Sequence, residues 1–197
     1  MTIDPEGEHN WGFTAKATPL HTDMPVPRGK ITGGTSAING QVYLRAIPED
    51  FDYWVEEGND EWSFEKVLPF LKNLENDLDL TNRYHGNDGP IIVRRYPLDE
   101  LVDDQAAFIK AATTAGFSRT DDHNHPASSG VGPLPLNNPD GVRWSTAIGY
   151  LTMARDRQNF TISPDSHTTR ILFNGKHAVG VEYLKSGFSH QVNAKEI

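Results

Sequence analysis

A glycine-rich segment between residues 29 and 40 places the strongest constraint on how this chain can fold. It reads Gly-Lys-Ile-Thr-Gly-Gly-Thr-Ser-Ala-Ile-Asn-Gly. The adjacent Gly33 and Gly34 can adopt positive φ angles and let the backbone approach a ligand closely. A helical turn starting there would direct free N–H groups at an anion such as a pyrophosphate, and Asn39 can both donate and accept hydrogen bonds. The spacing by itself favours a tight turn without a ligand, because loops of small residues are common.

The composition of the chain argues against several classes of protein. With 197 residues, of which 37% are hydrophobic and 23% charged, it is long enough for one good-sized domain or two small ones and is globular rather than disordered. A net charge of −9 without a basic stripe argues against nucleic-acid binding. The apolar runs are too short to span a membrane. Cysteine is absent and the start is acidic, unlike a secretory signal, so we expect a cytoplasmic protein.

Hydrophobic periodicity predicts three helices. The first should begin after Ser63 as its N-cap, and Pro69 is expected to divide it into two short helices or to kink it. The second should run from about residue 100 to residue 115 and stop at Gly116. Ser145 should cap the third helix.

The expected strands lie mostly near the end of the chain. A turn over residues 85–90 leads into a strand at residues 91–93. The tail is expected to form an antiparallel meander with a tight hairpin turn at Asn174-Gly175. Its strands are expected at residues 160–163, 168–173, 178–184 and 189–194. The proline-rich residues 1–27 and residues 121–141 are expected to be irregular, and a loop as long as the second one indicates function or mobility.

The sequence around the glycines resembles the first signature of the glucose–methanol–choline (GMC) oxidoreductases. The residues that carry this resemblance are Pro27 to Lys30, the segment through Tyr43 and Arg45, Pro48, Phe51-Asp52, Trp54, Gly58-Asn59, Trp62-Ser63 and Val67 to Pro69. Further matches are Trp11 to Phe13, His85-Gly86, Asp88 to Pro90, Ala111 to Phe117, Asp122, Asn124, Gly130 to Gly132, Gly141 to Arg143, Ser145, Tyr150-Leu151, Arg157 to Asn159 and Gly180 to Tyr183. Because these matches extend over nearly the whole chain, they are far more specific than the glycine motif alone.

The resemblance implies an α+β fold. This fold would comprise a partial FAD-binding domain of GMC type with an incomplete βαβ core, part of a substrate-binding domain and the antiparallel meander. The implied segments are the FAD-binding segment with the flavin loop at 1–62, the substrate-domain segment at 63–140 and the return to the FAD-binding domain at 141–197. The implied activity is that of an FAD-dependent alcohol or choline dehydrogenase or oxidase, in which a histidine base takes the hydroxyl proton while hydride passes to the flavin. The alternative is a non-catalytic fragment or paralogue that binds a ligand or a partner.

Family roles carry over to the positions that match. The residues expected to contact FAD are Gly33, Gly34, Thr35, Asn39, Gly40, Gln41, Val42 and Thr168. Thr168 replaces a valine whose backbone meets the adenine end in relatives. Ile38 occupies the position of a flavin-linking histidine in choline oxidases, and isoleucine has no nucleophilic atom, so FAD is expected to be non-covalent. Thr32, Gln41 and Ala46 differ from the residues usual at their positions.

Two parts of such an enzyme have no counterpart in this sequence. No dinucleotide-binding Gly-x-Gly-x-x-Gly turn precedes Trp11, and no C-terminal catalytic histidine is found. We therefore expect an internal fragment of a longer enzyme, inactive alone and without a catalytic residue of its own. A small-molecule alcohol is the expected substrate of the complete enzyme.

Outside the glycine-rich segment, the sequence offers one candidate metal site and no clear catalytic histidine or serine. The stretch Asp121-Asp122-His123-Asn124-His125 has ligand types suited to a divalent metal. No third strong ligand follows it and Pro126 fixes a turn, so we favour a surface loop or the lining of a substrate cavity and expect no metal. His85, which precedes a turn, is expected to be structural. The hydroxyl residues form no Gly-x-Ser-x-Gly nucleophile elbow.

Overall fold

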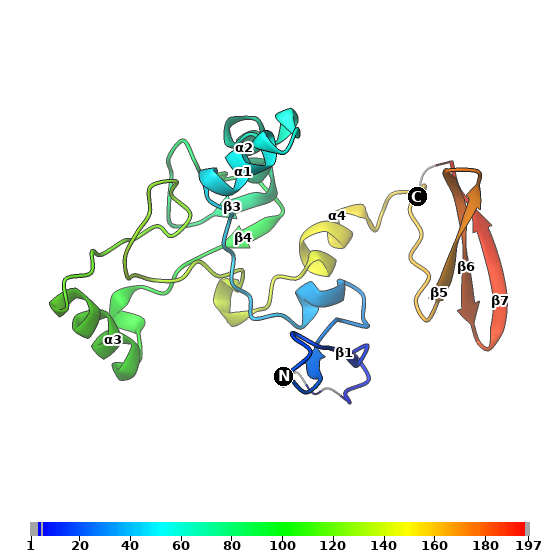
Figure 1. The fold of residues 1–197 in the computed structure, drawn as a ribbon, viewed down its shortest axis with the longest axis horizontal. Helices are drawn as coiled ribbons and strands as arrows, with labels where there is room; N and C mark the ends of the chain where they lie inside the picture. Colours follow the sequence, from blue (N-terminus) through cyan, green and yellow to red (C-terminus); the bar gives the residue numbers. More distant parts are fainter. Residues whose placement is uncertain (1–3, 5, 196–197) are drawn as a thin grey trace. The chain divides into compact units, whose positions relative to one another are not determined.

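Two compact units, Met1–Met153 and Ala154–Ile197, make up the chain. Figure 1 shows the computed structural model, which describes residue 4 and residues 6–195. Within these residues, the first unit contains helices and two pairs of short strands, and the second contains an antiparallel sheet, so the α+β class is confirmed. None of the described helices is long and apolar enough to cross a membrane. The division at residues 62 and 140 stays a prediction.

The N-terminal region contains a hairpin that the sequence did not predict. Strands β1 (Phe13–Ala15) and β2 (Met24–Val26) pair antiparallel, with Thr14 opposite Pro25. Proline is compatible with such a pair because each strand of a two-stranded sheet is an edge. The expectation of irregular structure was wrong here, because three-residue strands that are mostly exposed carry no alternating pattern. Residues 1–3 and 5 of that region lie outside the described part.

Aromatic rings hold the first helices together. Their bounds are α1 (Pro48–Glu56), the short 3-10 helix η2 (Asp60–Trp62) and α2 (Phe64–Leu74). Phe51 packs its ring against Trp54 and Phe64, and Trp54 meets Trp62 edge to face. Phe51 and Phe64 are buried and form part of the small apolar core.

Pro69 lies inside α2, which runs as one helix. The predicted division into two helices was therefore wrong, and a kink at Pro69 stays a prediction, whereas Ser63 is the N-cap as expected. A single proline removes the hydrogen bond to the carbonyl four residues earlier, here that of Glu65. Glu65 and Pro69 are both exposed, so water can satisfy that carbonyl while the opposite face of the helix stays packed.

A pair of parallel strands forms the centre of the first unit. Strand β3 (Glu75–Asp77) pairs with β4 (Ile91–Val93), which confirms the strand predicted at 91–93. Val93 is fully buried. The sequence did not reveal β3, because Glu-Asn-Asp is poor in the residues that favour strands. Between the strands, a Cβ on Gly86 would lie 1.9 Å from the carbonyl oxygen of Lys72, so this turn requires glycine.

The other two predicted helices are present with shifted starts. Four further helices follow β4 in the described part of the first unit, and a fifth, α4, includes the boundary between the two units. Their bounds are η3 (Leu98–Glu100), α3 (Asp103–Thr114), η4 (Pro139–Gly141), η5 (Ala147–Leu151) and α4 (Thr152–Ala154). Gly116, with φ of 94°, follows α3 as predicted. The third predicted helix starts as a π-helical turn, η5, with Thr146 rather than Ser145 as its N-cap. Turns of this type often occur at functional sites.

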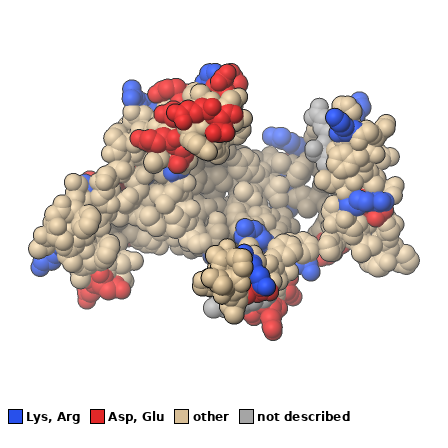
Figure 2. Space-filling model, viewed as in Figure 1, with Lys and Arg blue, Asp and Glu red and all other residues tan. Residues whose placement is uncertain are grey.

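Acidic side chains gather over one part of the first unit. In Figure 2 they cluster at the top of the view, where Figure 1 places α1 and α2. The acidic residues of α1 and η2 are Glu49, Asp50, Asp52, Glu56, Asp60 and Glu61. This surface repels anions, in keeping with the net charge of the chain.

The second unit is a three-stranded antiparallel sheet, which confirms the predicted meander. Its order is β5 (His167–Asn174), β6 (His177–Lys185) and β7 (Phe188–Asn193). The hairpin turn follows Asn174, and Gly175 supplies the positive φ of 60° that it needs. Residues 160–163 are not a strand, so that prediction was wrong. Sheet pairing requires a partner, and no described strand pairs with this segment.

Candidate functional site

The glycine loop, residues 29–42, begins with a tight turn built from closely packed glycines. Gly33 and Gly34 have φ of 93° and 56°, and the 3-10 helix η1 (Gly34–Ala37) starts there, as the sequence suggested. A Cβ on Gly29 would lie 2.2 Å from the Gly34 carbonyl oxygen, and one on Gly33 would lie 3.1 Å from the Cβ of Ala147. Position 29 therefore needs glycine for packing, and position 33 needs it because of its positive φ.

The other two glycines of the loop face open space. An added Cβ on Gly34 or on Gly40 would meet no atom within 4 Å. The loop is thus packed at Gly29 and Gly33, which fixes its path, whereas the positions at Gly34 and Gly40, here called its open side, leave room next to the backbone. Such a surface suits a flat ligand that must approach the main chain closely.

The end of the glycine loop is held in an unusual backbone conformation. Gln41 has φ of 65°, in the left-handed region that non-glycine residues rarely occupy. The Asn39 Oδ1 accepts the Gln41 N–H at 3.0 Å, and the Gln41 carbonyl accepts the Asn137 N–H at 2.8 Å. Val42 forms a bridge with Leu136. The loop is therefore anchored to a distant segment rather than held only by local contacts.

Directly after the loop, the chain enters a buried cluster of charged groups. The Arg45 guanidinium forms an ion pair with Glu75 and donates to the carbonyl of Tyr84 at 2.6 Å. Glu75 has no exposed surface. The backbone N–H of Arg45 donates to Asn124 Oδ1 at 2.9 Å, and Asn124 Nδ2 donates to the carbonyl of Tyr43 at 3.0 Å. Arg45 and Asn124 thus clamp the strand-like segment that leaves the loop.

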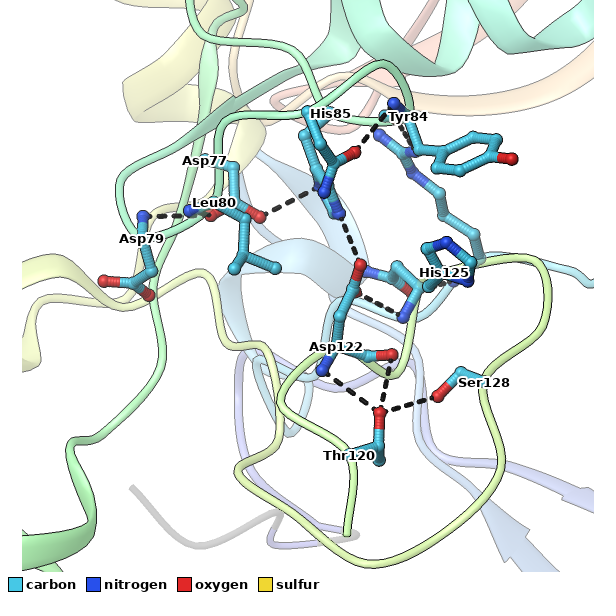
Figure 3. Close-up of polar contacts among 12 residues, drawn as sticks. Asp77, Asp79, Leu80, Tyr84, His85, Thr120, Asp122, His125 and Ser128 are labelled. Carbon is cyan, nitrogen blue, oxygen red and sulfur yellow. Dashed lines mark hydrogen bonds and ion pairs between the residues drawn. The ribbon is translucent and has the colours of Figure 1, made fainter.

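His85 lies at the centre of this cluster, as Figure 3 shows. Its Nδ1 is 3.0 Å from Glu75 Oε1 and 3.1 Å from Asp77 Oδ2, and its Nε2 is 3.0 Å from Asp122 Oδ2. Arg95 Nη1 binds both carboxylate oxygens of Asp77, at 2.9 and 3.0 Å. Since both ring nitrogens face carboxylates, the ring is an imidazolium that donates from each nitrogen.

The pKa shifts follow from these contacts. Burial by itself would lower the pKa of His85, but the hydrogen bonds to Asp122, Asp77 and Glu75 outweigh it and raise the pKa to about 10. Burial acts to raise the pKa of Asp77, yet His85 and Arg95 hold it at about 2. The same balance, with His85 as the main partner, lowers the pKa of Asp122. The cluster thus contains three cations, His85, Arg45 and Arg95, facing three carboxylates.

Glu75, Asp77 and His85 bring possible metal-ligand atoms within 4.8 Å of one another. Two guanidinium groups already neutralise these carboxylates, and the imidazole has no free lone pair to offer. The geometry therefore fits a structural ion cluster rather than a metal centre. His85 has the structural role that its position suggested.

The loop at residues 121–125 is joined to the same cluster. Asp122 pairs with His85 and Asn124 with the segment after the glycine loop, while His123 Nε2 lies 3.2 Å from the carbonyl of Gly132. His125 stacks edge to face on Tyr84. These side chains turn toward protein groups, and within the described residues they form no group of three potential ligands. The loop thus ties the site together, a role that the sequence did not indicate.

One depression in the first unit lies apart from the predicted site residues. It has a volume of about 620 Å³ and opens between the end of α2 and the turn before β4, with Lys72, Asn82 and Asp88 among its lining residues. None of the residues predicted to contact FAD lines it.

Comparison with known proteins identifies the family. The family model described as GMC oxidoreductase matches residues 15–197. The chain belongs to the GMC oxidoreductase family. The resemblance inferred from the sequence is thereby confirmed, and GMC membership implies FAD as the cofactor.

Several GMC relatives cover nearly all of this chain. A GMC-type oxidoreductase of Rhodococcus erythropolis is 37% identical over 197 residues, or 100% of this chain and 39% of that protein. An oxygen-dependent choline dehydrogenase of Xanthomonas campestris pv. campestris is 40% identical over 191 residues, or 94% of this chain and 34% of its own length. The solved structure of pyridoxine 4-oxidase from Mesorbium loti has a TM-score of 0.87 at 29% identity, covering 95% of this chain and 37% of that one. The chain thus spans between a third and two fifths of the length of these GMC relatives.

The GMC cofactor can be tested against the geometry of the glycine loop. The open space over Gly34 and Gly40 is what a flavin would need in order to lie against the backbone, so the loop fits the group. Seven of the eight residues predicted to contact FAD lie in this loop: Gly33, Gly34, Thr35, Asn39, Gly40, Gln41 and Val42. The eighth, Thr168, lies exposed in β5 of the second unit, opposite Tyr183. Their contacts with FAD stay predictions.

Proposed function

We propose that this chain is an internal segment of a longer FAD-dependent oxidoreductase that acts on the CH–OH group of an alcohol. The observation that supports this most directly is the glycine loop, whose open side is free of protein atoms over Gly34 and Gly40 in a chain of the GMC family. When bound, FAD supplies the chemistry by accepting a hydride from the alcohol carbon. The loop would form one wall of the flavin site.

The residues of the loop would bind and orient the cofactor without a covalent bond. Ile38 is half-buried and has no nucleophilic atom, and Gly34 and Gly40 leave room for the flavin. The Oδ1 of Asn39 accepts the Gln41 N–H, so this oxygen shapes the loop. We therefore propose dissociable FAD, which should appear in the supernatant when the protein is denatured and precipitated. FAD that stays with the precipitate would contradict this.

The proton acceptor is proposed to lie outside this chain. Among the histidines of the described residues, His85 has the most strongly shifted pKa, but it holds a proton on each nitrogen and is enclosed by carboxylates. A base must have a free lone pair within reach of the substrate hydroxyl. His85 therefore stabilises the scaffold behind the loop. We also propose a cytoplasmic location, on the ground that the chain contains no cysteine.

The test uses the full-length protein that contains this chain. It should purify with the visible absorption of bound flavin, and the flavin should bleach under anaerobic conditions on addition of an alcohol that it oxidises. A panel that includes choline, pyridoxine and aryl alcohols covers substrate types named for the relatives and neighbours. A full-length protein that binds no FAD after reconstitution would contradict the proposal. FAD binding without bleaching by any alcohol would favour a ligand-binding module instead.

A further inference from the structure

Residues 137–146, here called the anchor segment, contact the glycine loop at three places. At the start of the loop, Ser36 Oγ accepts the Thr146 N–H at 3.0 Å, and Thr146 Oγ1 donates to the Gly33 carbonyl at 3.2 Å. The residues paired in this way are more than a hundred positions apart in the sequence. The left-handed turn at Gly33 is therefore fixed by contacts that only the folded unit supplies.

The second contact comes from Arg143. Its Nη1 donates both to the backbone carbonyl of Asn39 and to Asn39 Oδ1, the latter at 3.2 Å. The same Oδ1 accepts the N–H of Gln41. Arg143 thus fixes the main chain and the side chain of Asn39 together, and Asn39 in turn holds the next turn of the loop.

The third contact secures Gln41 itself. Asn138 Nδ2 donates to Gln41 Oε1 at 3.0 Å, and the backbone N–H of Asn137 donates to the Gln41 carbonyl at 2.8 Å. Both asparagine side chains are more than nine-tenths buried, and their Oδ1 atoms have no hydrogen-bond partner in the described part of the chain. Unsatisfied buried acceptors are costly. The fold tolerates them at the place where Gln41 is held in its left-handed conformation.

Arg143 differs from the other buried and half-buried arginines of the first unit in what it binds. Arg45 and Arg95 pair with buried carboxylates, and Arg94 lies 3.8 Å from Glu100, whereas Arg143 has no carboxylate partner among residues 6–195. Its charge is directed at the oxygen atoms of one residue. Both contacts come from one nitrogen, Nη1, whose direction is fixed by the planar guanidinium, whereas a lysine ammonium at the end of a flexible stem is not directed in this way.

We propose that Arg143 is a positioning residue for the flavin site. It fixes Asn39, and through Asn39 the left-handed turn at Gln41, so that the open side of the glycine loop keeps the shape that receives the flavin. This inference rests on the proposed function. It assigns Arg143 a role in cofactor affinity that acts through another residue.

The experiment replaces Arg143 in the full-length protein and measures FAD binding to the apoprotein by fluorescence titration. R143M keeps the length of the side chain and removes its donors, and we expect FAD to bind about tenfold more weakly or worse, as loss of a charge-assisted hydrogen bond implies. R143K should bind FAD with intermediate affinity, because it restores the charge but not the fixed direction of the guanidinium N–H groups. The matched control is R94M, which removes another half-buried guanidinium of the same unit and should leave the affinity within about twofold.

Two further readouts separate positioning from a general loss of structure. The visible circular dichroism of the bound flavin should change in R143M and R143K but not in R94M. The effects of R143M and N39A on affinity should be less than multiplicative, because the two residues act in series. If FAD affinity and the flavin spectrum are unchanged in R143M, the inference about Arg143 is overturned while the proposed function stands. If R143M is insoluble, unchanged affinity and spectrum in R143K overturn the inference in the same way. A wild-type protein that binds no FAD overturns both.

Discussion

Replacing His85 with glutamine is expected to remove much of the stability of the first unit. It should also abolish the fall in stability that the wild type shows as the pH rises from 6.5 to 10. The ring has no exposed surface, and it bridges Glu75, Asp77 and Asp122. Its substitution leaves three carboxylates facing only the guanidinium groups of Arg45 and Arg95. Removing one partner from a buried ionic group lowers the free energy of unfolding by roughly 3–5 kcal/mol.

The pKa of His85 gives a second measure of the same effect. The pKa rises from 6.5 to about 10 on folding, and at 1.36 kcal/mol per pKa unit this corresponds to on the order of 5 kcal/mol. Because the folded pKa is the higher one, this stability is fully present below pH 6.5 and is lost as the pH rises through 10. The slope in between is about 1.4 kcal/mol per pH unit, with stability falling as pH rises.

The assay is urea unfolding of the full-length protein at several pH values between 6.5 and 10, followed by tryptophan fluorescence, since Trp54 and Trp62 lie in the same unit. The wild type should lose stability steadily over this range. H85Q should be much less stable at the lower end and should show little of that slope. H21Q, which replaces an exposed histidine of the same unit, serves as the control and should behave as the wild type. An H85Q variant with the slope of the wild type would refute the assignment of a doubly protonated ring.

Four other substitutions test separate parts of the structure. D77N should destabilise the first unit at neutral pH and weaken its response to acid. The pKa of Asp77 is lowered from 3.8 to about 2, so Asp77 contributes about 2 kcal/mol to the free energy of unfolding above pH 3.8, and this contribution is lost as the pH falls through 2. Acid unfolding curves measure the loss. G34A and G175A introduce the same side chain at φ of 56° and 60°, with open space at both sites. The unfolding midpoints of the two variants should match, but only G34A should weaken FAD binding. Equal FAD affinities would contradict a flavin site at the open side of the loop. G86A should prevent stable folding of the first unit, because its Cβ would lie 1.9 Å from the Lys72 carbonyl oxygen; a wild-type melting temperature would show that the turn can rearrange.

The sequence predicted the parts of the site that depend on local chemistry. The double glycine at 33 and 34 indicated a turn with positive φ, and both residues have it. The strand before Arg94, the helix ending before Gly116 and the C-terminal meander were also predicted, because apolar periodicity and turn residues report directly on local structure. The resemblance that named the family rested on the same kind of information, residue types at fixed spacings.

Two of the errors have a common physical origin. Strand β3 consists of Glu75, Asn76 and Asp77, and polar residues of this kind become buried only because cationic groups from elsewhere neutralise them. Pro69 was expected to interrupt its helix, yet packing of the opposite face outweighs the loss of one hydrogen bond. In both cases tertiary contacts overrode a local preference.

The sequence by itself therefore determined the glycine turn and the family, and the flavin contacts of the loop stay a prediction from it. Only the tertiary structure decided what holds that loop in place: the contacts of Arg143 and Thr146 with residues about a hundred positions earlier, and the charge cluster centred on His85. Hydrogen bonds and ion pairs of this kind depend on atoms brought within about 3 Å of each other by the fold. Spacing along the chain carries no information about such distances, whereas the ability of glycine to adopt a positive φ is a property of the residue itself.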